Sequence, residues 1–297
     1  MKYFYTFFIV LLLLGNVSHL RIAAAQGEET PPQAGSTTSE SKGYLFRYQF
    51  KEGQTLRWEV VHRTRTRTTM KETTIVADMY SQSEKVWAVK KVDEKGNATL
   101  ENSVGWMNMW QEMTGQPIVK YDSRTDKNVP NVYKSVSRMI KTPLAELIID
   151  NRGATTNRKD FFPQTQSQQL NPTQLTMPLP EKALQTGESW QIEKDLFLPK
   201  SGNVMLKVKT VQVYTLESVE NDLATIDYRT RILTPIHDPG TEAQLVQCRT
   251  RGKIVFDLNK GQVVSQEQNL DHAVPHFSGE ASTVRYINKF TEKWIGD

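Results

Sequence analysis

The chain has 297 residues, of which 38% are hydrophobic and 24% charged, so it is long enough to bury a core in one large domain or two small ones. Its 37 basic residues are interleaved with 33 acidic ones, giving a net charge of +4. This balance does not favour a nucleic-acid binder, which concentrates positive charge on one face. Cys248 is the only cysteine, which excludes an intrachain disulfide bond.

Residues 1–25 have the layout of a secretory signal peptide. One lysine precedes an uncharged apolar run at 3–15, and Ala23 and Ala25 supply the small residues of a cleavage site. The apolar run is shorter than the roughly 20 residues that a membrane-spanning helix needs, and no cysteine lies near the site to carry a lipid. We therefore predict an exported protein, periplasmic or secreted, that starts at Gln26 and has no integral membrane span after signal cleavage.

Two polar segments divide the rest of the chain. Residues 26–43 are rich in Pro, Ser, Thr and Glu and nearly free of large apolar side chains, which predicts a disordered leader. Residues 163–174 carry several glutamines and asparagines between prolines, which predicts a linker. The expected modules are therefore 44–162 and 175–297.

Alternation of apolar and charged side chains predicts long, half-buried strands. Leu56, Trp58 and Val60 fall on one face of an extended chain, while the charged residues beside them fall on the other. The same alternation recurs at 204–209 and 285–289. We predict a mainly β protein built as two similar modules of long twisted antiparallel strands.

Clear helical periodicity appears in one stretch. Val132, Val136 and Ile140 are spaced four apart, after Pro130 and before Pro143. This spacing predicts one short amphipathic helix, placed in the first module.

Three short matches occur in the same order in the two modules and favour an internal repeat. Gly53–Trp58 matches Gly187–Ile192, Val92–Leu100 matches Val219–Ile226, and Ile149–Gly153 matches Phe256–Gly261. Asp, Asn and Gly are also the residues that any tight turn uses. Duplication and shared turn chemistry therefore both account for the matches.

Three motifs carry a resemblance to a known family: FKEGQTLRW at 50–58, MPLPEKALQTGESW at 177–190 and FTEK at 290–293. They resemble a family of exported bacterial proteins of unknown function, frequent in planctomycetes, with a signature of leucine-proline followed by glycine, an acidic residue, serine and tryptophan. The resemblance covers nearly all of the mature chain. It implies export and a β architecture, and it brings no activity.

Arg63, Arg65 and Arg67 alternate with threonines. On a strand these side chains lie about 6.6–7 Å apart on one face, which suits a row of phosphates, sulfates or acidic sugars. A two-residue hairpin loop at 71–72 would place Asp78 opposite Arg65. The arginines are either a weak anion-binding stripe or a solvated strand face, and the second interpretation needs no ligand.

No catalytic or metal-binding constellation is apparent in the sequence. In a strand His272 and His276 lie about 13 Å apart, too far to share a metal ion, and Pro275 opposes a helix that would bring them together. The motif GESW at 187–190 lacks the second glycine of a hydrolase elbow and begins a strand. Cys248 is expected on a strand as a small buried hydrophobic residue. We predict no enzymatic activity, no metal and no cofactor.

The segment GWMNMWQEM at 105–113 has the most unusual composition. Trp106 and Trp110 share a face in either a strand or a helix, and Met107, Met109 and Met113 supply soft, adaptable contacts. These five residues are either core or the lining of a ligand site, with the predicted helix as a lid.

The function predicted first is non-enzymatic: an envelope protein that binds a lipid, another amphiphile or an envelope partner on a curved β surface. The alternative is a structural or adhesive protein that holds an anionic envelope polymer on its basic strand faces, and a hydrolase is the third interpretation. Nucleic acid is not an expected partner.

Overall fold

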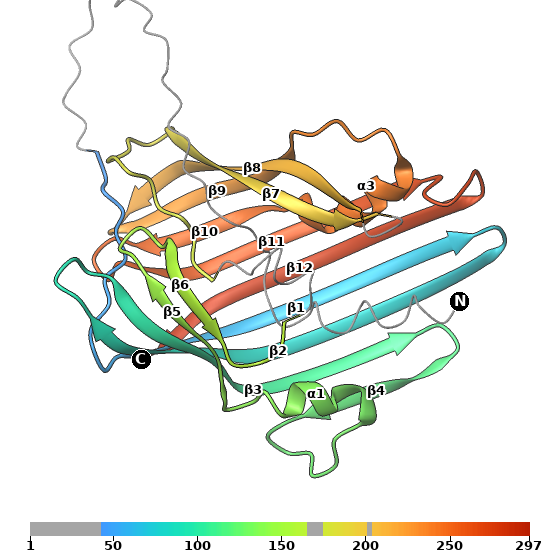
Figure 1. Ribbon diagram of the computed structural model, residues 1–297, viewed down its shortest axis with the longest axis horizontal. Helices are drawn as coiled ribbons and strands as arrows, with labels where there is room; N and C mark the ends of the chain where they lie inside the picture. Colours follow the sequence, from blue (N-terminus) through green and yellow to red (C-terminus); the bar gives the residue numbers. More distant parts are fainter. Residues whose placement is uncertain (1–42, 165–174, 201–203) are drawn as a thin grey trace, which may run out of the picture.

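The protein is described by a computed structural model, which covers residues 43–164, 175–200 and 204–297. These residues form one antiparallel sheet of 12 strands accompanied by short helices (Figure 1). The prediction of a mainly β fold is confirmed. The predicted signal peptide, almost all of the predicted leader and most of the predicted linker lie outside the described residues.

The first half of the chain contributes six strands. They are β1 (Thr55–Met70), β2 (Thr73–Val92), β3 (Ala98–Met113), β4 (Gln116–Asp122), β5 (Pro143–Ile149) and β6 (Thr155–Asp160). The loop between β1 and β2 consists of Lys71 and Glu72, so Arg65 stands opposite Asp78. The register predicted from a two-residue loop is confirmed.

The second half contributes the other six strands. They are β7 (Ser189–Pro199), β8 (Met205–Glu220), β9 (Leu223–Ile232), β10 (Arg251–Asp257), β11 (Gln262–Pro275) and β12 (Ser282–Gly296). The order across the sheet is β6-β5-β3-β2-β1-β12-β11-β10-β9-β8-β7, and β4 also pairs with β3. Because β1 pairs with β12, strands from both halves of the chain belong to one continuous sheet.

The three matched motifs fall at corresponding places in the two halves. The first pair leads into β1 and β7, the second forms the β2–β3 and β8–β9 hairpins, and the third forms the turns that follow β5 and β10. A duplicated module would place the motifs in this way. Two unrelated runs of antiparallel strands would also need turns at these places. The internal repeat stays a prediction.

The helix predicted before Pro143 is present but short. The 3-10 helix η2 (Asn131–Tyr133) leads into α1 (Lys134–Ser137), and Pro143 begins β5. The buried side chains of this segment are Tyr133 and Val136. The helix ends before Ile140, which forms an isolated bridge with Val104 on β3.

The second half contains a helix that the sequence analysis did not predict, and the expected placement of Cys248 on a strand is wrong. The chain forms α3 (Pro239–Leu245) and then η4 (Val246–Cys248). The Asp238 carboxylate caps α3 by accepting hydrogen bonds from the backbone N–H groups of Gly240 and Thr241, and Pro239 occupies the first turn. Cys248 packs beside a hydrophobic cluster, where burial raises the pKa of its thiol to about 11.

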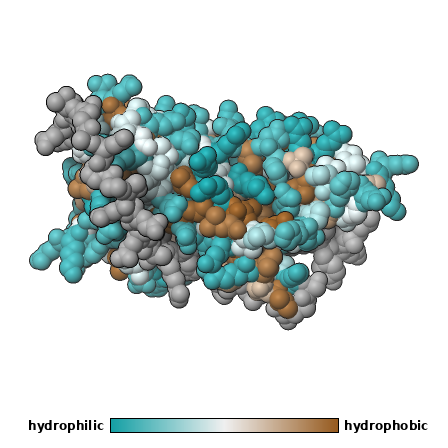
Figure 2. Space-filling model, turned by 90° about the horizontal axis from the view of Figure 1, so that it is seen from above, coloured by the Kyte–Doolittle hydropathy of each residue, from teal (hydrophilic) through white to brown (hydrophobic). Residues whose placement is uncertain are grey.

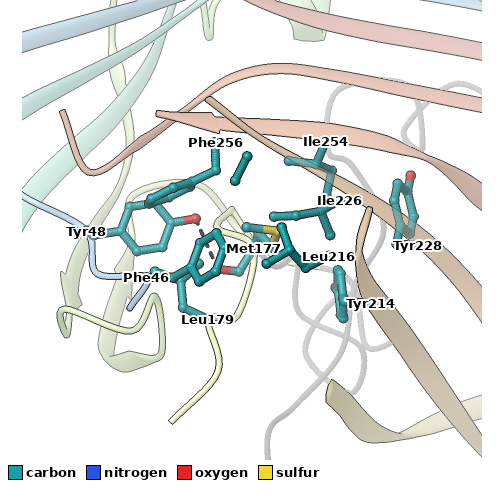
Figure 3. Packing of buried hydrophobic residues seen from close by; sticks show 11 residues of the cluster. Phe46, Tyr48, Met177, Leu179, Tyr214, Leu216, Ile226, Tyr228, Ile254 and Phe256 are labelled. Atoms are coloured by element: carbon teal, nitrogen blue, oxygen red, sulfur yellow. Dashed lines mark hydrogen bonds between the residues drawn. The ribbon is translucent and has the colours of Figure 1, made fainter. Parts of the chain in front are cut away.

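The sheet is curved (Figure 1). Its hydrophobic core lies on one face, which we call the inner face. Chain segments 43–50 and 175–184 cross this face and pack against β8, β9 and β10. Phe46, Tyr48, Met177 and Leu179 on these segments face Ile226, Phe256 and their neighbours on the strands (Figure 3). The Tyr48 hydroxyl donates a hydrogen bond to the Met177 carbonyl at 3.0 Å.

Four further hydrophobic clusters lie around this one. One joins β1, β2, β3 and β5 around Trp58 and Trp87, and one lies beneath η2 and α1. The last two lie beside α3 and η4. Val60, Met79 and Phe290, in the middle of the inner face, belong to none of the five clusters formed by the described residues.

Candidate ligand site on the inner face

The middle of the inner face is made by β2, β1 and β12, and we call its side chains the central strip. The central strip comprises Val60, His62, Thr64, Thr66, Met79, Ser81, Asn288 and Phe290. Strand pairing sets Thr64 between Met79 and Asn288, and it sets His62 between Ser81 and Phe290. Apolar and polar side chains are therefore neighbours both along each strand and between adjacent strands of the strip.

His62 occupies an apolar environment with one polar partner. Its Nε2 lies 2.5 Å from Oδ1 of Asn288, and its ring meets the Phe290 ring edge to face at 6.0 Å between centroids. Burial lowers the pKa of His62, and the hydrogen bond with Asn288 opposes this shift only in part. The imidazole is therefore neutral near pH 7 and donates its Nε2–H to Asn288.

Two hydroxyls in the central strip are buried without a hydrogen-bond partner. Thr64 is 3% exposed and Thr66 is 8% exposed, and neither Oγ1 has a partner within the described chain. A buried hydroxyl without a partner costs about 1–3 kcal/mol, so such atoms are rare in folded proteins. Each hydroxyl has one donor and two acceptor sites, and none of them is used within the described residues.

A buried ion pair closes one end of the central strip. Lys85 on β2 pairs with Glu292 on β12, whose side chains are 16% and 11% exposed. The Lys85 ammonium also lies 4.5 Å from the Trp58 ring centroid and 4.7 Å from that of Trp87. Because the two charges compensate each other, this end of the strip presents no net charge to a ligand.

The three methionines proposed for a ligand site lie on the inner face. Met107 and Met109 are 1% and 4% exposed and pack with Tyr133 and Val136 beneath η2 and α1. Met113 stands at the end of β3, partly buried, opposite Ala77. The helical segment does cover part of the curved sheet, and the first two methionines belong to the hydrophobic cluster under it.

The two tryptophans proposed for the same site lie on the opposite, outer face. Trp106 lies below Arg124, whose Cζ is 4.0 Å from the ring centroid, and both tryptophans are only partly buried. Trp110 stacks on Tyr80 at 6.0 Å. Side chains alternate along a strand, so the tryptophans and the methionines cannot line one pocket. The alternation within GWMNMWQEM already contained this information.

The predicted arginine stripe also lies on the outer face. Arg63 donates to Asp78 at 3.3 Å and lies above the Trp110 ring at 5.8 Å from its centroid. Arg65 and Arg67 are exposed and make no ion pair within the described ranges. The threonines between these arginines form the inner side of the same strand, and only their alternation with the arginines marks them in the sequence.

Within the described part of the chain, His272, His276 and Lys194 do not form a shared site. His272 Nε2 lies 3.5 Å from Glu242, whereas His276 Nδ1 lies 2.8 Å from the Glu280 carbonyl oxygen. In the described part of the chain no three His, Cys, Asp or Glu residues group as metal ligands. Lys194, on the inner face of the edge strand β7, is 5% exposed, and burial lowers its pKa to about 7.

Apolar side chains also reach the surface. Figure 2 shows hydrophobic residues gathered in the middle of the face seen from above, with hydrophilic residues around them. Across 43–164, 175–200 and 204–297, no helix has the length and apolar character needed to cross a membrane.

Comparisons with known proteins give no family. No protein-family model and no curated protein matches the chain. A lipovitellin structure concerned with lipid–protein interactions is similar over 84% of this chain and 26% of its own, with 10% identity and a TM-score of 0.47. OccK7 (OpdD) of Pseudomonas aeruginosa is similar over 82% of this chain and 99% of its own, with 7% identity and a TM-score of 0.25. The chain thus spans about a quarter of the lipovitellin chain.

Proposed function

We propose that the protein binds an amphiphilic ligand, such as a lipid, along the central strip, and that it acts without catalysing a reaction. One observation carries the proposal: among the described residues, the buried hydroxyls of Thr64 and Thr66 have no hydrogen-bond partner, and no hydrophobic cluster of those residues fills this part of the inner face. Ligand sites are mostly apolar, with a few polar groups that orient the ligand. The strip offers both kinds of group.

The chemistry of the strip favours a ligand whose polar group is uncharged. The apolar part of the ligand would lie along Val60, Met79 and Phe290, and its polar group would bond to Thr64 and Thr66. A charged group would lose its hydration and find no net opposite charge, because Lys85 and Glu292 already compensate each other. A monoacylglycerol or a fatty alcohol fits these requirements better than a fatty-acid anion.

The site would serve a protein of the cell envelope or the extracellular space. Export remains a proposal that rests on the signal-peptide layout of residues 1–25. Intact-mass measurement of protein from its own host should give a chain that starts at Gln26. Retention of residues 1–25 in a membrane fraction would show that this segment is an anchor.

The binding proposal is tested with monoolein and a double variant. Native mass spectrometry of the purified protein should show a complex with monoolein. In the variant Thr64→Val/Thr66→Val the affinity for monoolein should fall by about 5- to 150-fold, because two hydrogen bonds of about 0.5–1.5 kcal/mol each are lost. The unliganded variant should unfold at the same or a higher temperature, because two partnerless hydroxyls are removed from the interior.

The matched control changes a threonine on the other face of the sheet. Thr291 lies on the outer face of β12, opposite Val61, so Thr291→Val should leave monoolein binding unchanged. Equal monoolein affinity in the wild type and the double variant, or a wild type that binds neither monoolein nor a fatty alcohol, would contradict the proposed function.

A further inference from the structure

One lateral row on the outer face of the sheet has only cations among its charged residues, and we call it the cationic row. Strand pairing sets each of its members opposite the next, in the order Arg229, Arg251, Asn269, Lys289, Arg63, Tyr80, Trp110 and Lys120. The row crosses eight strands, from β9 to β4. At 4.7–4.9 Å between neighbouring strands its length is about 34 Å.

Like charges stand directly opposite each other in the cationic row. Arg229 faces Arg251, and Lys289 faces Arg63. Such pairs destabilise a sheet, whereas opposite charges stabilise it. The next row of the sheet has opposite charges side by side, because Lys253 stands between Asp227 and Glu267. Alternating charges of this kind keep a strand face soluble without destabilising it. The like-charge pairs of the cationic row need another explanation.

The cations of the row are also mostly free of acidic partners. Arg63 pairs with Asp78, whereas the other four cations are exposed and form no ion pair with any described residue. These four are Lys120, Arg229, Arg251 and Lys289. Several cations elsewhere on this face do have partners: Lys207 meets Asp195 at 2.8 Å, and Arg285 meets Asp271 at 2.6 Å. Arg65 and Arg67, beside the row on β1, are unpaired among the described residues.

We infer that the cationic row binds a linear acidic polysaccharide that runs across the strands. Carboxylate and sulfate groups accept short, charge-assisted hydrogen bonds from arginine and lysine. The sheet curves across its strands (Figure 1). The row also runs across the strands, on the outer face. A flexible chain can follow this curvature and reach every cation, whereas a flat membrane surface would reach only a part of the row.

The aromatic residues of the row argue against single-stranded nucleic acid. Nucleic-acid strands bind by stacking bases on free aromatic faces. Tyr80 and Trp110 stack on each other with an angle of 14° between their planes, and Arg63 lies above the Trp110 ring. One face of each ring is therefore taken up by the other ring, which leaves less aromatic surface for bases than a free ring offers.

The polysaccharide site lies on the opposite face of the sheet from the central strip. It therefore does not depend on the proposed function, and the two can fail separately. Loss of heparin binding should leave monoolein binding intact, and the reverse should also hold.

Two triple variants of the full chain test the inference, with heparin as the probe. Arg229→Ser/Arg251→Ser/Lys289→Ser removes three cations of the row. Lys207→Ser/Lys253→Ser/Arg285→Ser removes three outer-face cations that have acidic partners, at 2.8, 2.6 and 2.6 Å. Both variants change the net charge equally, so they separate the row from the overall charge.

The row variant should bind heparin about tenfold or more weakly than the wild type at low salt. Its affinity should also depend less steeply on salt, because fewer ions are released on binding. Its melting temperature should stay equal or rise, because like-charge repulsion is removed. The control variant should lose less affinity for heparin.

Three outcomes would overturn the inference. One is an equal loss of heparin affinity in the two variants, which would mean that only net charge matters. Another is a wild type that does not bind heparin. The third is a row-dependent affinity that is stronger for phosphatidylglycerol vesicles or oligo-deoxythymidine than for heparin, which would identify a membrane or a nucleic acid as the partner.

Discussion

The imidazole of His62 is held in its neutral form by the side chains around it. It meets the Phe290 ring and shares one hydrogen bond with Asn288, and burial lowers its pKa. An unfolded chain exposes the same imidazole to water, where its pKa is about 6.5. The folded and unfolded states therefore bind different numbers of protons below that pH.

This difference predicts how stability depends on pH. As pH falls below about 6.5 the unfolded state takes up a proton that the native state does not bind, so the free energy of unfolding falls, by at most about 1.4 kcal/mol per pH unit. In His62→Gln this decrease should be absent, and the pH profile should be flatter between pH 7 and 5. Urea denaturation measures both profiles, with His276→Gln as the exposed control. Parallel profiles for the wild type and His62→Gln would contradict the prediction.

The tryptophans differ in what their removal should cost. Trp58 is 2% exposed, donates a hydrogen bond to the Val263 carbonyl at 2.9 Å and contacts Lys85. Trp58→Ala should lower the free energy of unfolding by about 3–5 kcal/mol. Trp106→Ala and Trp110→Ala should cost less, because these rings are partly exposed on the outer face. Urea titration of the three variants checks this ranking, and a larger loss at Trp106 would refute it.

At the scale of strands, the ion pair of Lys85 with Glu292 links β2 to β12 across β1. A buried pair is costly to break on one side, because the remaining charge lacks a partner. Glu292→Ala should therefore lower stability by about 3–5 kcal/mol. The double variant Lys85→Met/Glu292→Leu should recover most of this loss, because both charges are replaced by apolar groups.

A double-mutant cycle on the free energy of unfolding measures this coupling. The cycle compares the wild type, the two single variants and the double variant. The single variant Lys85→Met should also be less stable than the wild type. If the double variant is as unstable as the sum of the two single variants, the pair does not couple the strands, and each residue acts through its own packing.

The whole molecule should unfold in one transition. β1 and β12 pair along nearly their whole lengths, and Phe46 packs against Trp190 and Phe256 from the other half of the chain. The two halves therefore share both a sheet and a core. Tryptophan fluorescence and far-ultraviolet circular dichroism should give the same midpoint in urea, and Phe46→Ala should move both midpoints together. Two separate midpoints would show that 44–162 and 175–297 are independent folding units.

Local patterns in the sequence determined the strands and one part of their pairing. The alternation at Leu56, Trp58 and Val60 predicted β1, since a side-chain period of two is a property of the strand itself. The two-residue loop set Arg65 opposite Asp78, because a hairpin's register follows from its turn. The sequence also contains the capping signal of α3, Asp238 followed by Pro239.

Only the tertiary structure decided that β12 pairs with the second edge of β1, and hence which side chains form the central strip and the cationic row. Thr64 meets Asn288, and Arg63 meets Lys289, across pairs separated by more than 220 residues. The central strip needs three strands and the cationic row needs eight, so neither exists in any single segment. Pairing of distant strands depends on chain closure and on packing over the whole sheet. A local period shows that residues share a face, and the complete fold decides whether that face becomes the core, a ligand site or a charged surface.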